Sequence, residues 1–313
     1  MNHLWMSFQV VFPLFFYMLI GYGIRRVNLL SETVMDELNQ LVFKLILPVN
    51  LFMQIYRSDL THSLNPKLSG LVLLLLFAVY VSLYIGVPHF IKEKKDAVVI
   101  LQGIYRSNFV LFGFVLANNL CQGQDTGVVA ALAALVVPIY NILAVVALET
   151  MLGGKVKFGH ILLGIIKNPL VIGGVSGIFF AFFRIPIPDL LVDSLAEFGD
   201  MATPIALICL GGVLSFKSVK RHRKLLTAAV LGRLVIVPVI AISAGVLLGY
   251  RYVELVALLA LFASPTAISS VPMSYAMGAN GKLAGEIVAI TSVASIFTLF
   301  VFIYVMKLQG WIS

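Results

Sequence analysis

Long apolar runs separated by short polar breaks fill this chain almost from end to end. Each run has about 20 residues, the length that a helix needs to cross roughly 30 Å of hydrocarbon. The runs predict ten transmembrane helices, near residues 8–24, 34–56, 68–91, 97–120, 128–151, 160–183, 195–215, 225–249, 252–277 and 284–307. The predicted fold class is an all-α membrane protein with a single membrane domain.

Composition supports this prediction, because 60% of the 313 residues are hydrophobic and 12% are charged. Soluble globular proteins have about 25% charged residues. The net charge of +8 would suit a nucleic-acid-binding protein, but the Lys and Arg residues gather in short loops between apolar runs. We therefore expect membrane lipid, and no nucleic acid, around the chain. Its two cysteines and five histidines indicate neither a metal site nor a cofactor.

The distribution of basic residues predicts an orientation in the membrane. Alternate loops hold 13 Lys and Arg residues, whereas the loops on the other side hold 5. The positive-inside rule places the basic loops in the cytoplasm and both termini outside, in a multi-pass protein of a bacterial cell membrane. The first run lacks the basic start and the cleavage site of a signal peptide, so we expect it to be retained.

An internal repeat appears when the chain is shifted by 156 residues. Three pairs of punctuating residues then coincide, namely Pro13 with Pro169, Gly21 with Gly177 and Pro48 with Pro204. Residues 1–156 and 157–313 each contain five predicted helices. Because five is odd, the second copy enters the membrane in the opposite orientation, which is the inverted-repeat architecture of many secondary transporters.

Two predicted helices contain polar breaks of the kind that bind substrates at mid-membrane. In the ninth, Pro265 and Pro272 each remove a backbone donor. Hydroxyl groups surround them, from Ser264, Thr266, Ser269 and Ser270. A continuous helix is not expected there.

The fourth predicted helix has the matching break. Arg106, Ser107 and Asn108 lie within an apolar run, and Gly113 allows close approach of another helix. The 156-residue shift superimposes Asn108 on Ser264, so we expect the two breaks to face each other with a substrate site between them. For the serines and Gly113, ordinary helix packing is an equally good interpretation.

Further polar groups lie within predicted helices. Tyr140 and Asn141 follow Pro138 and are included in the candidate site. Arg233 either snorkels from the start of its helix or is buried. The 156-residue shift superimposes Lys44 on Asp200, which suggests a charge pair that is either a coupling element or a static bridge.

Four motifs resemble one known family when taken together. They are RSNFVLFG at 106–113, VPIYNILAVVALE at 137–149, KNPLVIG at 167–173 and SPTAISS at 264–270. In this order and spacing the chain resembles the auxin efflux carrier family, and in particular its bacterial, malate-permease-like branch. The resemblance covers essentially the full length.

The resemblance implies a ten-helix fold similar to sodium/proton antiporters and bile acid symporters, with a scaffold part and a transport part. The fourth and ninth helices would cross at their breaks, with Asn108 and residues 264–270 lining the site and Pro265 marking the crossing. It also implies an organic-anion substrate. Val115 and Pro272 depart from the family pattern, which puts the geometry of both breaks in question.

The sequence therefore predicts a secondary transporter of small organic anions, such as malate, other carboxylates or auxin-like acids, that works by alternating access. A cation-coupled symporter of larger amphipathic anions is the alternative, followed by a channel or a membrane sensor. No enzyme constellation is recognisable. The coupling ion, proton or sodium, is left open, as are import against export and a homodimer.

Overall fold

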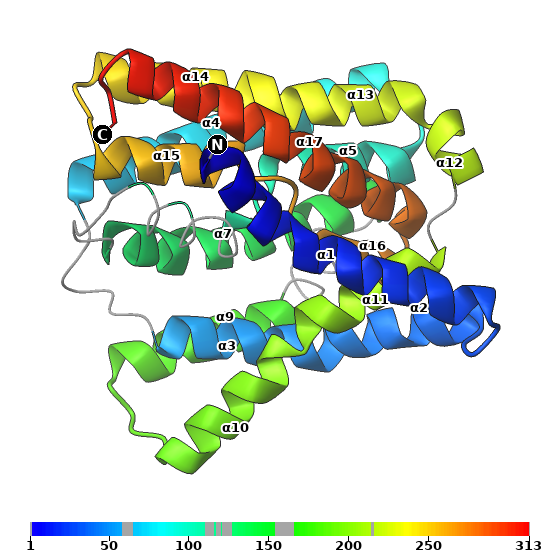
Figure 1. Ribbon diagram of the computed structural model, residues 1–313. Helices are drawn as coiled ribbons and strands as arrows, with labels where there is room; N and C mark the ends of the chain where they lie inside the picture. The colour runs from blue at the N-terminus through cyan, green and yellow to red at the C-terminus, as the bar shows by residue number, and fades with distance from the viewer. Residues whose placement is uncertain are drawn as a thin grey trace.

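The computed structural model describes residues 2–57, 65–109, 116, 120, 127–153, 166–213 and 216–312. All regular elements in these ranges are helices (Figure 1). Six spans in the described ranges are long and apolar enough to cross a membrane, judged by length and composition. The predicted all-α membrane architecture is confirmed at this level, whereas the count of ten helices stays a prediction.

The helices follow the predicted apolar runs closely. The first half contains α1 (Asn2–Arg26), α2 (Glu32–Leu41), the π-helical turn η1 (Val42–Ile46), α3 (Leu47–Tyr56), α4 (Pro66–Phe90), α5 (Lys94–Tyr105) and α7 (Gly127–Leu152). The second half contains α9 (Pro169–Phe182), α10 (Asp189–Asp200), α11 (Ala202–Val213), α12 (Phe216–Arg221), α13 (Arg223–Leu231), the π-helical turn η2 (Gly232–Ile236), α14 (Val237–Leu247), α15 (Val253–Ala263), α16 (Ser270–Ala276) and α17 (Gly281–Leu308).

The fourth and ninth runs are the ones that break, as the sequence predicts. Helix α5 ends at Tyr105, although the apolar run continues to about residue 120. Helix α15 ends at Ala263, and α16 begins at Ser270 after an irregular stretch. The predicted helix interruption is therefore confirmed in both runs. Gly113 and Val115 lie outside the described residues.

Proline explains the π-helical turns. Both η1 and η2 end two residues before a proline, Pro48 in the first case and Pro238 in the second. A proline has no N–H to donate and its ring crowds the carbonyl group four residues earlier, so the preceding turn widens. The turn at Met201 between α10 and α11 lies three residues before Pro204.

The helices form two blocks (Figure 1). We call α1, α2, α3, α9, α10 and α11 the scaffold block, because α1 packs against α11, α3 against α9 and α10, and α2 against α11. We call α4, α5, α7 and α13 to α17 the core block, because α4 packs against α5, α14 against α15 and α16 against α17. Contacts of α2 with α16, α1 with α17 and α7 with α9 join the two blocks.

Close glycine contacts repeat along the scaffold block. The backbone of Ile208 in α11 leaves no room for a Cβ on Gly21 of α1. The backbone of Phe52 in α3 also lies close to Gly177 of α9, where a Cβ would meet the Phe52 carbonyl oxygen at 3.0 Å. Each residue of the second pair is related to one of the first by the 156-residue shift found in the sequence. The α1–α11 and α9–α3 contacts are thus built alike.

Candidate functional site

The two interrupted segments cross each other in the core block. Beyond the ends of α5 and α15 the chain is extended, and Ser107 forms an isolated antiparallel bridge with Thr266. The backbone N–H of Asn108 donates to the carbonyl oxygen of Pro265 at 2.8 Å. Each of the two segments therefore satisfies a backbone group of the other at the point where the helices end.

The two halves are offset slightly at the crossing. The structure pairs Asn108 with Pro265 and Ser107 with Thr266, so the two breaks lie against each other. The two half-helices end at Tyr105 and Ala263, which are 158 residues apart. A two-residue difference between the halves accumulates before the crossing, so a shift set by distant prolines misses it.

Arg233 binds both half-helix ends from η2. Its Nε donates to the Ser264 carbonyl oxygen at 2.7 Å, and its Nη2 donates to that of Leu261 at 2.9 Å. Pro265 cannot donate to Leu261, four residues earlier, so the guanidinium replaces the missing backbone donor. Arg233 also donates through Nη1 to the last carbonyl groups of α5, from Ile104 and Tyr105, at 3.2 and 3.4 Å.

This placement decides between the two interpretations of Arg233. The side chain is 0% exposed, so it is buried at the crossing and does not snorkel to the surface. Its positive charge lies at the C-terminal ends of two half-helices, where the helix dipoles are negative. Arg233 therefore stabilises the crossing electrostatically as well as through hydrogen bonds.

Thr266 adds a second fastening. Its hydroxyl donates to the Gly103 carbonyl oxygen at 2.6 Å, and its backbone N–H donates to the Thr291 hydroxyl at 3.2 Å. These bonds tie the ninth segment to α5 and to α17. The sequence assigns Thr266 to the binding site. In the structure its side chain is 1% exposed, and its hydrogen bonds hold the crossing together.

Arg106 lies on the other side of the crossing, 1% exposed. Its Nη2 donates to Asn141 Oδ1 at 2.7 Å and to Ser269 Oγ at 2.8 Å. Its Nη1 contacts Gln102 Oε1 at 3.2 Å and Met273 Sδ at 2.9 Å. All of these partners are neutral, and Nε has no partner among the described residues. The charge of this buried guanidinium is therefore not balanced by a carboxylate in the described structure.

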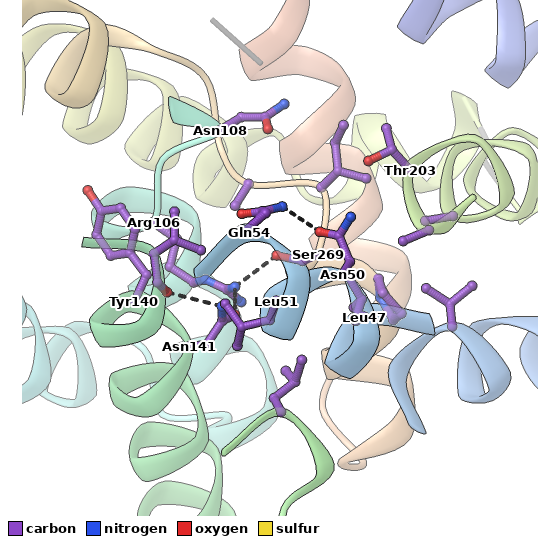
Figure 2. Close-up of a pocket in the computed structure, with 18 of the residues that line it drawn as sticks. Leu47, Asn50, Leu51, Gln54, Arg106, Asn108, Tyr140, Asn141, Thr203 and Ser269 are labelled. Carbon is purple, nitrogen blue, oxygen red and sulfur yellow. Dashed lines mark hydrogen bonds between the residues drawn. The ribbon is translucent and has the colours of Figure 1, made fainter. Parts of the chain in front are cut away.

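A cavity of about 390 Å³ opens beside this guanidinium, between the scaffold and core blocks. Figure 2 shows Arg106, Tyr140 and Asn141 along one side and Asn50, Leu47 and Thr203 along the other. Its polar lining residues are Asn50, Gln54, Arg106, Ser107, Asn108, Tyr140, Asn141, Asp200, Thr203 and Ser269. The rest of the described lining is aliphatic, from residues such as Leu51, Val137 and Ile268. This is the composition of a small-molecule site, apolar with a few convergent polar groups.

Two residues of the crossing that line the cavity have unsatisfied donors. Ser107 Oγ and Asn108 Nδ2 are buried and have no hydrogen-bond partner in the described structure. Unpaired buried donors are costly unless a ligand or water completes them. Arg106, Ser107 and Asn108 thus place three donor-bearing side chains in succession beside the cavity, a residue content that suits an anion.

On the scaffold-block side of the cavity, polar side chains are linked by hydrogen bonds. Gln54 donates to the side-chain oxygen of Asn50, and Asn50 Nδ2 donates to Asp200 Oδ1 at 3.4 Å. Sequence reasoning missed Asn50, Gln54 and Thr203. The signal that could have found them is their position within one to six residues of Pro48 or Pro204.

The structure separates the other predicted site residues from the cavity. Ser264 and Ser270 are buried and donate to the carbonyl groups of Ala260 and Ala267, respectively, within their own segment. Neither they nor Pro265 are part of the described lining, whereas Pro272 is.

The suggested pair of Lys44 and Asp200 is not formed in this structure. Lys44 is exposed and donates to Gln40 on its own helix at 3.0 Å. Asp200 instead accepts from Asn50. Both charges stand four residues before a proline, as the sequence indicates, but they point to different surroundings. Within the described ranges no group of three His, Cys, Asp or Glu residues is arranged to hold a metal ion.

A cavity between two blocks, beside two interrupted helices that cross, defines a membrane carrier rather than a soluble binding protein. Comparison with known proteins agrees. The chain matches a family described as "Membrane transport protein" twice, over residues 6–158 and 155–303. It belongs to this membrane transport protein family, the auxin efflux carrier family indicated by the motifs.

One curated relative is similar over its whole length. An uncharacterized transporter of Methanocaldococcus jannaschii is 23% identical over 315 residues, covering 97% of this chain and 98% of the relative. The family and this relative identify the chain as a membrane transporter and not an enzyme.

Proposed function

We propose that this protein moves small carboxylates across the cell membrane by alternating access, with the cavity beside Arg106 as the substrate site. The observation that carries the proposal is the uncompensated charge of Arg106. This guanidinium is buried, all its hydrogen-bond acceptors are neutral, and Nε remains free of described partners. A buried cation without a counter-ion is costly, and a bound carboxylate would remove that cost.

The neighbouring residues have distinct roles in this proposal. Arg106 neutralises the carboxylate, while Ser107 and Asn108 offer the unpaired donors that orient it. Asn141 and Ser269 hold the guanidinium in place through their oxygens. Tyr140 also lines the cavity, and its ring packs edge-on against that of Tyr105.

The volume of the cavity bears on the choice of substrate. At about 390 Å³ it lies near the lower end of the range for ligand sites, which is roughly 300–1,000 Å³. Acids of about the size of malate suit this volume better than the large amphipathic anions of a bile-acid-symporter-like carrier. Auxin-like acids remain within the proposal, and proton or sodium is the coupling ion to test.

Alternating access follows from the position of the cavity between the two blocks. We propose ten membrane crossings, arranged as inverted five-helix repeats over residues 1–156 and 157–313, with both termini outside. The predicted cytoplasmic loops support this orientation, because the α1–α2 turn, α12 and the start of α17 lie at one end of the molecule (Figure 1). Sliding of the core block against the scaffold block would expose the cavity to each side in turn.

Transport assays on reconstituted protein test the proposal. Proteoliposomes would be loaded with a panel of mono- and dicarboxylates under separately imposed proton, sodium and voltage gradients. We expect saturable uptake of at least one small carboxylate, and its loss in Arg106→Gln. Passage of every acid at a rate proportional to its concentration would indicate a channel instead.

A further inference from the structure

The cavity has charges of both signs on facing blocks. Among the described residues that line it, Arg106 is the one cation and Asp200 the one anion. Arg106 belongs to the core block, and Asp200 ends α10 in the scaffold block. The ion pairs of the described residues involve neither of them. The cavity is thus lined by one residue of each charge sign, on facing blocks, and neither residue has a counter-ion among the described residues.

Asp200 has spare acceptor capacity toward the cavity. The side chain is exposed, and the hydrogen bond described for its carboxylate is the long one from Asn50, at 3.4 Å. A carboxylate accepts up to about four hydrogen bonds. Gln54 donates to Asn50, and Asn50 donates to Asp200. The amide donors of this wall therefore point toward the carboxylate. No described cation lines the same wall.

The charge balance discriminates between classes of carboxylate. A dicarboxylate on Arg106 would bring its second negative charge into the same small cavity as Asp200, which is unfavourable at low dielectric. A simple monocarboxylate would leave Asp200 without a partner when the blocks close over it. A molecule with one carboxylate and one ammonium group would neutralise both residues and make the occluded site electrically neutral.

We propose that the preferred cargo of this cavity is a small zwitterion, with its carboxylate on Arg106 and its ammonium group on Asp200. This inference rests on the proposed function, because the carboxylate end uses the same guanidinium. Asp200 is then a specificity-determining residue that rejects dianions. Because its two anchors belong to different blocks, such a cargo would also contact both blocks at once while the transporter changes state.

Matched sets of acids test this inference on the purified full-length protein. Each set comprises an ω-amino acid, the unsubstituted acid and the dicarboxylic acid with the same number of carbons, from glycine up to 6-aminohexanoate. Equilibrium binding is measured for all, and uptake into proteoliposomes for the tightest. At the best chain length we expect the amino acid to bind at least about tenfold more tightly than either counterpart.

Variants assign the preference to Asp200. Asp200→Asn keeps the shape and the acceptor for Asn50, so it should fold, lose the tenfold preference for the amino acid and bind the dicarboxylic acid more tightly than the parent does. Asp200→Glu should retain part of the preference. Glu197→Gln is the matched control, because Glu197 lies on the same helix but not in the described cavity lining, and it should bind like the parent.

The outcomes separate this inference from the proposed function. Tighter binding of dicarboxylic acids to the parent protein, or an unchanged preference in Asp200→Asn, overturns the zwitterion assignment. Proton-coupled uptake of dicarboxylates that depends on Asp200 also overturns it, because Asp200 would then carry a proton in place of an ammonium group. In these cases binding that is lost in Arg106→Gln still supports the carboxylate carrier. Absence of any such binding overturns both.

Discussion

The two buried arginines at the crossing differ in what they bind. Arg233 directs its donors to main-chain carbonyl groups at the ends of α5 and α15. Arg106 directs its donors to neutral side chains and borders the cavity. Both are almost completely removed from solvent, at 0% and 1% exposure. Burial alone therefore does not distinguish a structural arginine from a binding one, whereas the chemistry of the acceptors does.

The difference has a physical basis. Half-helix C-termini carry partial negative charge and unsatisfied carbonyl groups, so they compensate a guanidinium without any ligand. Neutral amide and hydroxyl oxygens orient a guanidinium but leave most of its charge available. We therefore assign Arg233 to the stability of the crossing and Arg106 to the substrate, and the following predictions test this division.

The largest expected effect is that of Arg233→Met. This change leaves the carbonyl groups of both half-helix ends without donors, and each unsatisfied buried group costs about 1–3 kcal/mol. We expect a large fall in the yield of folded protein and in the melting temperature, measured in detergent. The exposed Arg223 on the neighbouring helix α13 supplies a control, since Arg223→Met should change neither quantity. Normal stability of Arg233→Met would refute the assignment of Arg233 to the stability of the crossing.

Arg106→Gln should have the next largest effect, on binding rather than on folding. Its loss removes a charge-assisted hydrogen bond to the carboxylate, worth about 1.5–3 kcal/mol, or roughly tenfold or more in affinity. The protein should keep a melting temperature close to that of the parent. Titration calorimetry with the transported acid checks this, and Arg106→Lys should fall between the two because it retains the charge but not the planar fork.

A smaller effect is expected for Thr291→Val. The Thr291 hydroxyl accepts from the backbone N–H of Thr266, and valine has nearly the same shape without that acceptor. We expect a loss of about 1 kcal/mol in stability, typical of hydrogen bonds within membrane proteins. Thermal unfolding with and without substrate measures it. An effect confined to substrate affinity would instead assign Thr291 to the binding site.

The smallest effect is expected for Lys44→Met. Lys44 is exposed and its described partner is Gln40 of the same helix, so the change should alter stability by no more than about 0.5 kcal/mol. Transport should also be preserved. Gradient-driven uptake that collapses in Lys44→Met but is restored by adding Asp200→Leu would instead show that the two charges pair in another state of the cycle.

Much of the fold could be predicted from the sequence, because apolar runs and prolines act locally. Pro48, Pro204 and Pro265 mark kinks or breaks in the helices. Arg106, Ser107 and Asn108 are conspicuous as polar residues in an apolar run. The repeat shift also superimposes Gly21 on Gly177, and both glycines lie at helix contacts in the structure. These features depend on a few neighbouring residues or on simple counting.

The remainder depends on how distant segments pack. The register of the crossing is set by contacts between α5, α15 and η2, so the shift of 156 derived from distant prolines differs by two from the 158 residues that separate the half-helix ends at Tyr105 and Ala263. The role of Arg233 requires carbonyl groups from two other helices. In the sequence Asn50 and Gln54 look like ordinary polar residues. Their place in the cavity lining depends on how α3 packs opposite Arg106.

The most direct test of the central claim is a thermal-shift measurement on the parent protein and on Arg106→Gln, with and without small carboxylates. At least one carboxylate should raise the melting temperature of the parent in a saturable manner. Arg106→Gln should unfold near the same ligand-free temperature but no longer respond. An equal response of both proteins to the same carboxylate would contradict the assignment of Arg106 to the substrate.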